Sequence, residues 1–440
     1  MRYMRFLQNK EGIIVMNALV PALIGLSLPA MIIGNGFTYG LAILGLLLAF
    51  SLPQVRDSKG IRESLSQLMR SPTVWVVILL LLALYIGTLT GLRPEYSVKH
   101  WVRLVIMAAV SGLLYHVYRT AESENKILVW LMWGVQATYI IAFAIAAAEP
   151  WVYPLGYYGD KLWSETHLRF YSSLLAVVLP FCWMLWLKPT ANGAIDLRER
   201  SQLSGMLWVC SSILLVLLCC GRSGWLGVIA SALVWIAMMM RYHKLRLPRL
   251  SVMALLAAGT LAVSAVTYIL LYGMRSIKER IGVTIPDRGL GGGRLDIWQL
   301  AWEHVFDKPL FGIGVNGFRF IPGADYHPHN FVLQIWLEGG FVSLLLAFAL
   351  IGMMAFTLFR RGKASATSAT GLAALAGFVI CALTNKSIFN LEWLVVLVVV
   401  MPLAFASSPA RANVGVRTQP QTITKNVTTA KKPLSKKGKK

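Results

Sequence analysis

Residues 274–340 read MRSIKERIGVTIPDRGLGGGRLDIWQLAWEHVFDKPLFGIGVNGFRFIPGADYHPHNFVLQIWLEGG. This segment is the only long polar interval between hydrophobic runs that are long enough to cross a membrane. It holds three of the seven histidines of the chain and three tryptophans, set among arginines, carboxylates and glycines. Loops placed on a rigid scaffold commonly carry function, so we expect the functional site in this segment.

The composition of the chain is that of a membrane protein. The 440 residues are 57% hydrophobic and 14% charged, whereas soluble domains carry about 25% charged residues. Apolar runs of about 20 residues recur along the chain, which is the helix length that crosses a bilayer core of about 30 Å. We therefore predict an all-α polytopic membrane protein with about twelve transmembrane helices. Basic cytoplasmic loops and a basic tail explain the net charge of +23, so we expect membrane lipids and no nucleic acid as partners.

The apolar runs divide the chain into four parts. Residues 1–273 are predicted to form transmembrane helices one to nine, and residues 274–340 a large loop with short helices. Residues 341–406 then form helices ten to twelve. The last part, 407–440, has nine basic residues and no acidic one, so we predict a disordered cytoplasmic tail. Such a tail is either simply solvated or attracted to anionic lipid.

The distribution of lysine and arginine predicts the topology. Counted from a cytoplasmic N-terminus, the even-numbered connections all face the cytoplasm and carry most of the lysine and arginine of the loops, as the positive-inside rule requires. Both termini are then cytoplasmic, and the large loop faces the opposite side of the membrane together with the GRSG turn, residues 221–224. The basic connections are those at residues 56–70, 198–200, 241–249 and 360–363.

Arg222 lies in the GRSG turn between the seventh and eighth predicted helices. An arginine at the end of a transmembrane helix commonly extends its side chain to the interface, which is the simplest explanation for Arg222. The glycine-bracketed turn, however, also supplies backbone N–H groups beside the guanidinium. That combination suits a phosphate.

Arg294 follows a glycine run and opens the segment RLDIWQLAWEHVF. The segment is predicted to be an amphipathic helix lying over the membrane, with one apolar face formed by Leu295, Trp298, Trp302 and Val305. An arginine in the first turn of a helix is unfavourable for the helix dipole. An anion shared by Arg294 and the helix N-terminus would explain its position.

The histidines of the loop lie in YHPHNFVLQIWLEGG. His327 and His329 are candidate proton acceptors, because a histidine with an unperturbed pKa of about 6.5 can remove a proton at neutral pH, although a lone histidine is more often a polar interface residue. Asn330 is predicted to cap a helix that begins at the next residue. Gln334 and Glu338 continue a polar stripe at a spacing of four, which indicates function if it faces the bundle interior.

Metal binding is the competing use of the His-Pro-His segment, with Asp325 and Glu338 nearby. Two ligands two residues apart are not a strong zinc spacing, and the sequence has no HExxH, P-loop or GxSxG motif. The five cysteines lie in apolar runs without a CxxC spacing, which favours packing roles. We expect neither a metal ion nor a cofactor.

An ordered set of motifs carries a family resemblance. GRSG is followed by R-x-D-I-W-x-x-A, by K-P-L-F-G-I-G-x-x-x-F and finally by HNFVLQIWLEGG. This set resembles the O-antigen ligase and polymerase superfamily, in particular its ligase branch of the WaaL type. In topology the resemblance covers most of the chain, and in motif it covers residues 219–340.

The resemblance implies a GT-C-like membrane glycosyltransferase of lipopolysaccharide biosynthesis. Such enzymes transfer O-antigen polysaccharide from undecaprenyl diphosphate to a sugar of lipid A–core, on the periplasmic face of the bacterial inner membrane. They invert the anomeric centre without a metal or a nucleotide. The two important arginines of the family map onto Arg222 and Arg294, and its histidine maps onto His329.

The residues of this chain suggest further contributions. Arg169, at the predicted outer end of the sixth helix, is either a third phosphate contact or an arginine that extends to the interface. Gln334 and Glu338 are expected to orient the histidine or the acceptor. His327 and Asn330 complete the candidate acceptor side of the site.

Three other functions fit the same sequence features. An O-antigen polymerase uses the same donor with a growing glycan as acceptor, and a protein O-oligosaccharyltransferase uses it with a protein acceptor. A lipid or sugar transporter would also have about twelve helices. Transporters more naturally carry charges at mid-membrane, whereas the charges here lie at the predicted outer boundary.

Overall fold

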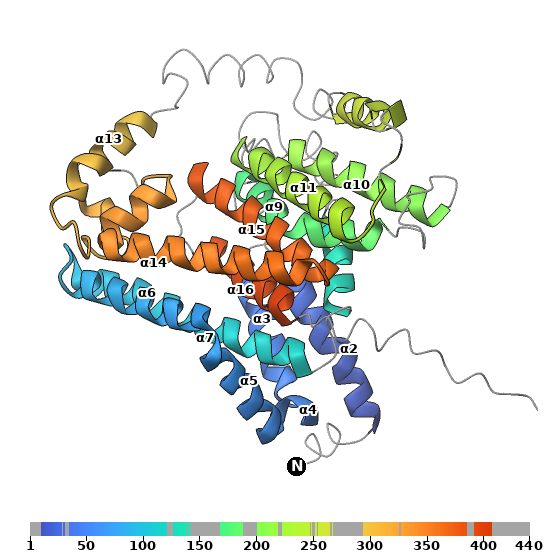
Figure 1. The fold of residues 1–440 in the computed structure, drawn as a ribbon, viewed down its shortest axis with the longest axis horizontal. Helices are drawn as coiled ribbons and strands as arrows, with labels where there is room; N and C mark the ends of the chain where they lie inside the picture. The colour runs from blue at the N-terminus through green and yellow to red at the C-terminus, as the bar shows by residue number, and fades with distance from the viewer. Residues whose placement is uncertain are drawn as a thin grey trace, which may run out of the picture.

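The structure is a computed structural model that describes residues 10–28, 30, 35–120, 126–138, 140, 168–187, 200–218, 222–246, 248, 251, 252, 254–264, 266, 294–324, 327–384 and 391–406. Its named elements are all helical, which confirms the all-α prediction for these residues (Figure 1). They are α2 (Lys10–Ser27), α3 (Asn35–Ala49), α4 (Pro53–Arg56), α5 (Ser58–Arg70), α6 (Pro72–Leu89), α7 (Pro94–Thr120), α9 (Leu168–Trp186), α10 (Arg200–Leu218), α11 (Arg222–Tyr242), α13 (Arg294–Val305), the 3-10 helix η2 (Phe318–Phe320), α14 (Phe331–Gly362), α15 (Ala366–Thr384) and α16 (Leu391–Ala406).

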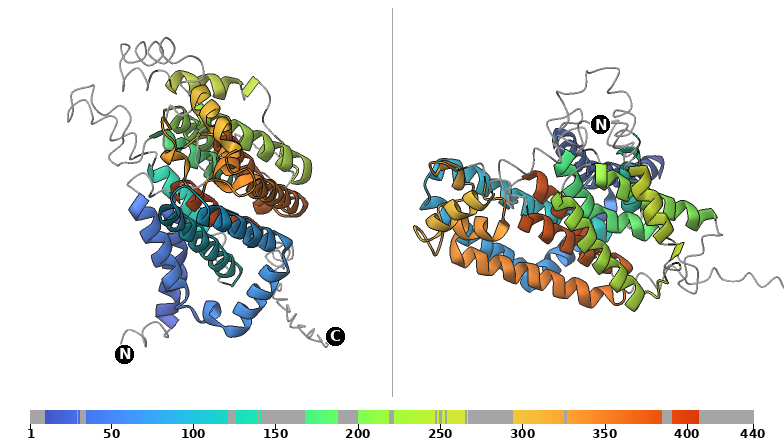
Figure 2. Two further views of the ribbon diagram at one scale, coloured as in Figure 1. Left: turned by 90° about the vertical axis from the view of Figure 1, so that its left-hand side faces the viewer. Right: turned by 90° about the horizontal axis from the view of Figure 1, so that it is seen from above.

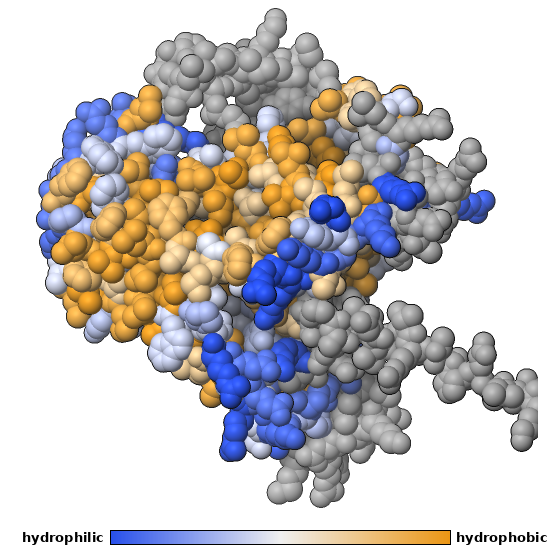
Figure 3. Space-filling view, in the orientation of Figure 1, coloured by the Kyte–Doolittle hydropathy of each residue, from blue (hydrophilic) through white to orange (hydrophobic). Residues whose placement is uncertain are grey.

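Five of the described helices are long and apolar enough to cross a membrane. They are Pro72–Leu89, Pro94–Arg119, Ser223–Tyr242, Phe331–Gly362 and Ala366–Thr384, and five shorter apolar helices accompany them. Apolar side chains cover the surface over α6 and α14, with polar surface to either side of them (Figure 3). The chain is a membrane protein. The count of twelve transmembrane helices stays a prediction.

Two connections predicted from the sequence are helical in the structure. The basic connection between the second and third predicted spans contains α5, which is capped by the Asp57 side chain. α7 begins at Pro94, two turns before the predicted start of its span at Trp101. Proline and glutamate in the first turn are ordinary helix-start signals, which explains this early start.

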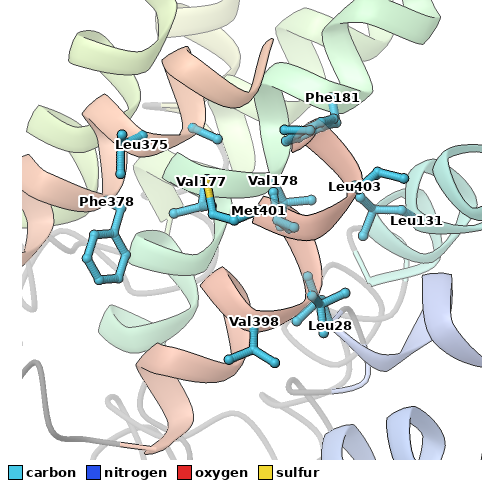
Figure 4. Close-up of a cluster of buried hydrophobic side chains, with 14 of the residues drawn as sticks. Leu28, Leu131, Val177, Val178, Phe181, Leu375, Phe378, Val398, Met401 and Leu403 are labelled. Atoms are coloured by element: carbon cyan, nitrogen blue, oxygen red, sulfur yellow. The ribbon is translucent and has the colours of Figure 1, made fainter. Parts of the chain in front are cut away.

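A continuous apolar core joins the helices (Figure 4). Lipid is as apolar as these side chains, so helix association in a membrane depends on close packing more than on burial from water. Part of the core lies where α9, α15 and α16 meet the end of α2. Figure 4 labels Leu28, Leu131, Val177, Val178, Phe181, Leu375, Phe378, Val398, Met401 and Leu403 there.

The bundle has two different ends. At one end, here called the basic end, the side chain of Arg119 donates to Gln67 of α5, and His243 Nε2 donates to the Gly362 carbonyl at 2.8 Å. The opposite end, called the loop end, holds residues 294–324 and 327–330. There the Leu92 N–H, between α6 and α7, donates to the Ile313 carbonyl at 2.9 Å. α13 lies beside the first turns of α14 in all three views (Figures 1 and 2).

α14 is broken at Gly340, where the large loop was predicted to end. Gly340 has φ 75° and ψ 176°, a conformation outside the helical region. The break is bridged by the loop, since Phe341 N donates to Pro309 O at 2.7 Å and Val342 N donates to Leu310 O at 3.3 Å. A Cβ atom at Gly340 would lie 2.2 Å from the Leu310 carbonyl carbon, so only glycine fits.

We predict that Gly340→Ala strongly destabilises the protein. A non-glycine residue at this φ costs about 1–3 kcal/mol, and the contact with residue 310 adds to that cost. Thermal unfolding of the detergent-solubilised protein should show a lower midpoint. Gly352→Ala, in the same helix with open space at its Cβ position, is the matched control. Equal midpoints for the two variants would contradict this account of the break.

Candidate active site

The site is built on three helices that pack unusually closely. A Cβ atom at Gly227 of α11 would lie 2.9 Å from Ala176 Cβ of α9 and 3.0 Å from the Gly377 carbonyl of α15. A Cβ atom at Gly377 would lie 2.5 Å from the Ala176 carbonyl. Small residues let helix backbones approach in this way within membranes. α9, α11 and α15 therefore form one tightly packed unit.

The register of this unit places particular helix ends together. Gly224 of α11 packs on Ser172 of α9, one turn before the contact between Gly227 and Ala176. α9 and α11 therefore run in the same direction, and their N-terminal ends lie side by side. The thiol of Cys381, one turn from the end of α15, donates to the Ser223 carbonyl at 3.3 Å. The C-terminal end of α15 thus meets the N-terminal end of α11.

Arg294 is joined to the same place. Its Nη1 donates to the carbonyl of Thr384, the last residue of α15, at 2.6 Å. Cys381 and Thr384 are one helical turn apart. One turn of α15 therefore contacts both Ser223, which follows Arg222, and Arg294, which begins α13.

The backbones of Arg222 and Arg169 begin α11 and α9, the latter at its second residue. The side chains of both arginines lie outside the described part of the structure, as do residues 219–221. The N-terminal ends of α9 and α11 therefore lie together, and the Arg294 side chain reaches the end of α15 that contacts them. The two N-termini add partial positive charge from their unpaired N–H groups, while the Arg294 guanidinium binds a carbonyl at the negative C-terminal end of α15. Such positive charge at one place favours an anion.

The histidine pair is attached to α13 one turn after Arg294. The indole Nε1 of Trp298 donates to the Pro328 carbonyl at 2.8 Å. The rings of His327 and His329 flank this proline, with centroids 4.2 Å apart. His329 has φ 55°, a left-handed conformation that directs the backbone into the following helix. α13 thus links the pair to the C-terminal end of α15.

Asn330 caps the N-terminus of α14, as predicted from the sequence. Its Oδ1 accepts from the N–H groups of Val332 and Leu333 at 3.0 and 3.3 Å. A helix cap of this kind stabilises a helix by about 1 kcal/mol. It also fixes the backbone immediately after His329.

Gln334 and Glu338 are fully buried and hold the loop. Glu338 accepts hydrogen bonds from Asn316 N at 2.9 Å, Phe318 N at 3.3 Å and Gln334 Nε2 at 3.2 Å. The polar stripe therefore faces the protein interior. These hydrogen bonds give Gln334 and Glu338 a positioning role on the segment 308–318.

The KPLFGIG motif, residues 308–314, lies against α14 and is bonded to it through backbone hydrogen bonds. Ile313 N and Gly314 N donate to the carbonyls of Leu337 and Glu338 at 2.9 and 3.0 Å. Gly312 has φ 74°, and a Cβ atom there would lie 2.4 Å from the Glu338 carbonyl carbon. The motif glycines are thus required for the loop to lie against α14.

α13 is a helix as predicted, and its apolar residues divide between an exposed and a buried side. Leu295 and Trp302 are exposed, whereas Ala301 and Val305 are buried against the loop and α14. The sequence predicted an apolar face turned to the membrane, and Leu295 and Trp302 of that face are exposed, whereas Val305 is buried in the protein. Trp302 also lies edge-on against Trp336.

The alternative metal site has no support among the described residues. Within these ranges no group of three potential metal ligands lies close together. Asp325 lies outside them, and both carboxylate oxygens of Glu338 accept hydrogen bonds from the protein.

Fold and site together define a polytopic, all-α membrane protein with a loop that covers one end of its bundle. Residues 206–348, from α10 to the first part of α14, match the family described as O-antigen ligase. The predicted resemblance to the O-antigen ligase superfamily is confirmed in this segment.

A curated relative agrees with this family. It is the “Putative polysaccharide ligase” of Rickettsia conorii, 27% identical over 113 residues. The alignment covers 21% of this chain and 27% of the relative, so the chain matches about a quarter of that protein.

We predict that Glu338→Ala releases the loop. The substitution leaves the buried N–H groups of residues 316 and 318 without an acceptor, at about 1–3 kcal/mol for each group. Limited proteolysis of the purified protein should cut residues 308–320 faster. The matched control is Glu303→Ala on α13, where the exposed carboxylate accepts a hydrogen bond from the Gln299 side chain. Unchanged cleavage of the Glu338 variant would rule out the positioning role.

Proposed function

We propose that the protein is an O-antigen ligase. It transfers a polysaccharide from undecaprenyl diphosphate to a sugar hydroxyl of lipid A–core, on the periplasmic face of the bacterial inner membrane. The family match supports the reaction class. The word ligase in the name of the relative favours this reaction over polymerisation.

One observation carries the proposal. A single turn of α15 contacts both the start of α11, next to Arg222, and the guanidinium of Arg294. Residues that are far apart in the sequence therefore meet beside the N-terminal ends of α9 and α11. A diphosphate is the group of the donor that such a concentration of positive charge would bind.

The proposed reaction is a single displacement at the anomeric carbon. The acceptor hydroxyl forms the new C–O bond while the bond from the sugar to the diphosphate breaks, with inversion. Arg222 and Arg294 stabilise the charge that develops on the departing diphosphate, and Arg169 adds a third contact. His329, supported by His327, takes the hydroxyl proton. The reaction as proposed uses no metal and no cofactor.

Asn330, Gln334 and Glu338 have positioning roles in this proposal. Asn330 fixes the backbone after His329, and Glu338 holds the loop against α14. From the sequence, Gln334 and Glu338 were expected to orient the histidine or the acceptor. In this proposal they act by holding the loop in place.

We predict that Arg222→Gln and Arg294→Gln each lower the transfer rate by about 10²–10³, because each removes charge stabilisation of the leaving group. His329→Ala should lower it by about 10²–10⁴, the usual effect of losing a general base. The rates are measured with purified protein, lipid-linked donor and lipid A–core. Arg241→Gln, at the opposite end of α11, and His304→Ala on α13 are the controls.

The same variants in cells separate the related functions. A ligase variant should leave lipid-linked polymer intact and the core without polysaccharide. Loss of the lipid-linked polymer itself would instead identify a polymerase. If all three variants still attach long polysaccharide to the core, the assignment of the site is wrong. Donor movement across the membrane without transfer would identify a transporter.

A further inference from the structure

A second group of cationic and polar side chains lies on α7, at the loop end. Tyr96, His100 and Arg103 are spaced four and three residues apart, so they lie on one face of the helix. The same face continues toward the basic end as buried core, with Met107 8%, Leu114 0% and Val117 0% exposed. The group therefore belongs to the interior-facing stripe of α7.

Arg103 is exposed although it lies on this interior-facing stripe. Among the described residues it makes no hydrogen bond and no ion pair. A charged residue within a membrane-spanning helix usually faces a partner or an aqueous space and marks a site. The stripe is thus accessible at its loop end and closed beyond Met107.

The large loop supplies the rest of the group. Arg319 Nη1 donates to the Tyr96 hydroxyl at 2.6 Å, and the guanidinium lies 5.4 Å from the Tyr96 ring centroid. Asn316 Nδ2 lies 3.0 Å from His100 Nδ1. When the amide donates, the hydrogen of a neutral His100 ring is on Nε2. Arg103 and Arg319 both interact electrostatically with this ring.

The depth of Tyr96, His100 and Arg103 in the membrane is inferred from the residues on the lipid-facing side of α7. Glu95 and Lys99 are exposed there, whereas the next exposed positions, Val102, Ile106 and Leu113, are apolar. The change from charged to apolar side chains marks the boundary of the bilayer core. His100 and Arg103 lie at that boundary, which is the level of lipid phosphates.

We propose that Arg103, with His100 and Arg319, forms a second anion site that binds a phosphate on the headgroup of the acceptor glycolipid. The proposal rests on the proposed function for the identity of this lipid. Arg103 supplies a charged donor without a described ion-pair partner, and His100 supplies a neutral donor beside it. Glu338, which interacts electrostatically with Arg319, is buried and accepts three hydrogen bonds.

The anion site at α7 is joined to the loop that carries the catalytic histidine. Asn316 contacts His100 and, through its N–H group, Glu338. Glu338 lies on the same part of α14 that begins after His329. An acceptor held by its phosphate at α7 would therefore be held against the loop segment that positions the catalytic histidine.

Binding of lipid A–core to the full-length protein in nanodiscs tests this site. We predict that Arg103→Gln raises the Kd for phosphorylated lipid A–core about tenfold, the effect of one lost charge-assisted hydrogen bond. Binding of acid-dephosphorylated lipid A–core should not change, and Arg103→Lys should retain part of the affinity. Lys99→Gln, one turn away on the lipid-facing side, is the matched control.

Several outcomes would overturn the proposal. They are an unchanged Kd in Arg103→Gln, an equal loss for both forms of the acceptor, and a raised KM for the lipid-linked donor. Equal competition by phosphatidylglycerol nanodiscs would assign the site to bulk anionic lipid instead. Because binding is measured without turnover, a wild-type protein that binds as predicted but transfers no glycan would refute the proposed function and leave the phosphate site in place.

Discussion

The close approach of α9, α11 and α15 is the constraint on which the rest of the structure depends. Gly227 and Gly377 leave room for backbone contact where any side chain would separate the helices. In a membrane such contact replaces the burial of apolar surface as the source of specific association. It also fixes the register of the helices, and through the register it brings together the helix ends that bear the arginines.

Local rules made much of the fold predictable. The apolar runs gave most helices within a few residues, and the asparagine cap and the arginine start predicted the beginnings of α14 and α13. The early start of α7 was missed because its first two turns are polar and aromatic. The start signals were nevertheless present in Pro94 and Glu95. As a result, Tyr96 and His100 were assigned to a connection and not considered as site residues.

The meeting of the arginine-bearing segments could not be predicted from the sequence. The bond between Cys381 and the residue after Arg222 spans 158 positions, and the bond from Arg294 to Thr384 spans 90. Such pairs depend on helix register, which no local pattern specifies. In the same way, the spacing of Gln334 and Glu338 predicted a polar stripe, but only the packed loop shows that Glu338 accepts backbone N–H groups of residues 316 and 318.

The break at Gly340 divides α14 into two parts that have different surroundings. The part before Gly340 is fixed to the loop by Glu338, and the part after it faces lipid through Phe341, Leu345 and Phe348. A helix in a bilayer adjusts its tilt to the local thickness of the membrane. Because the backbone kinks at Gly340, the tilt of the lipid-facing part need not match the direction of the part that begins after His329.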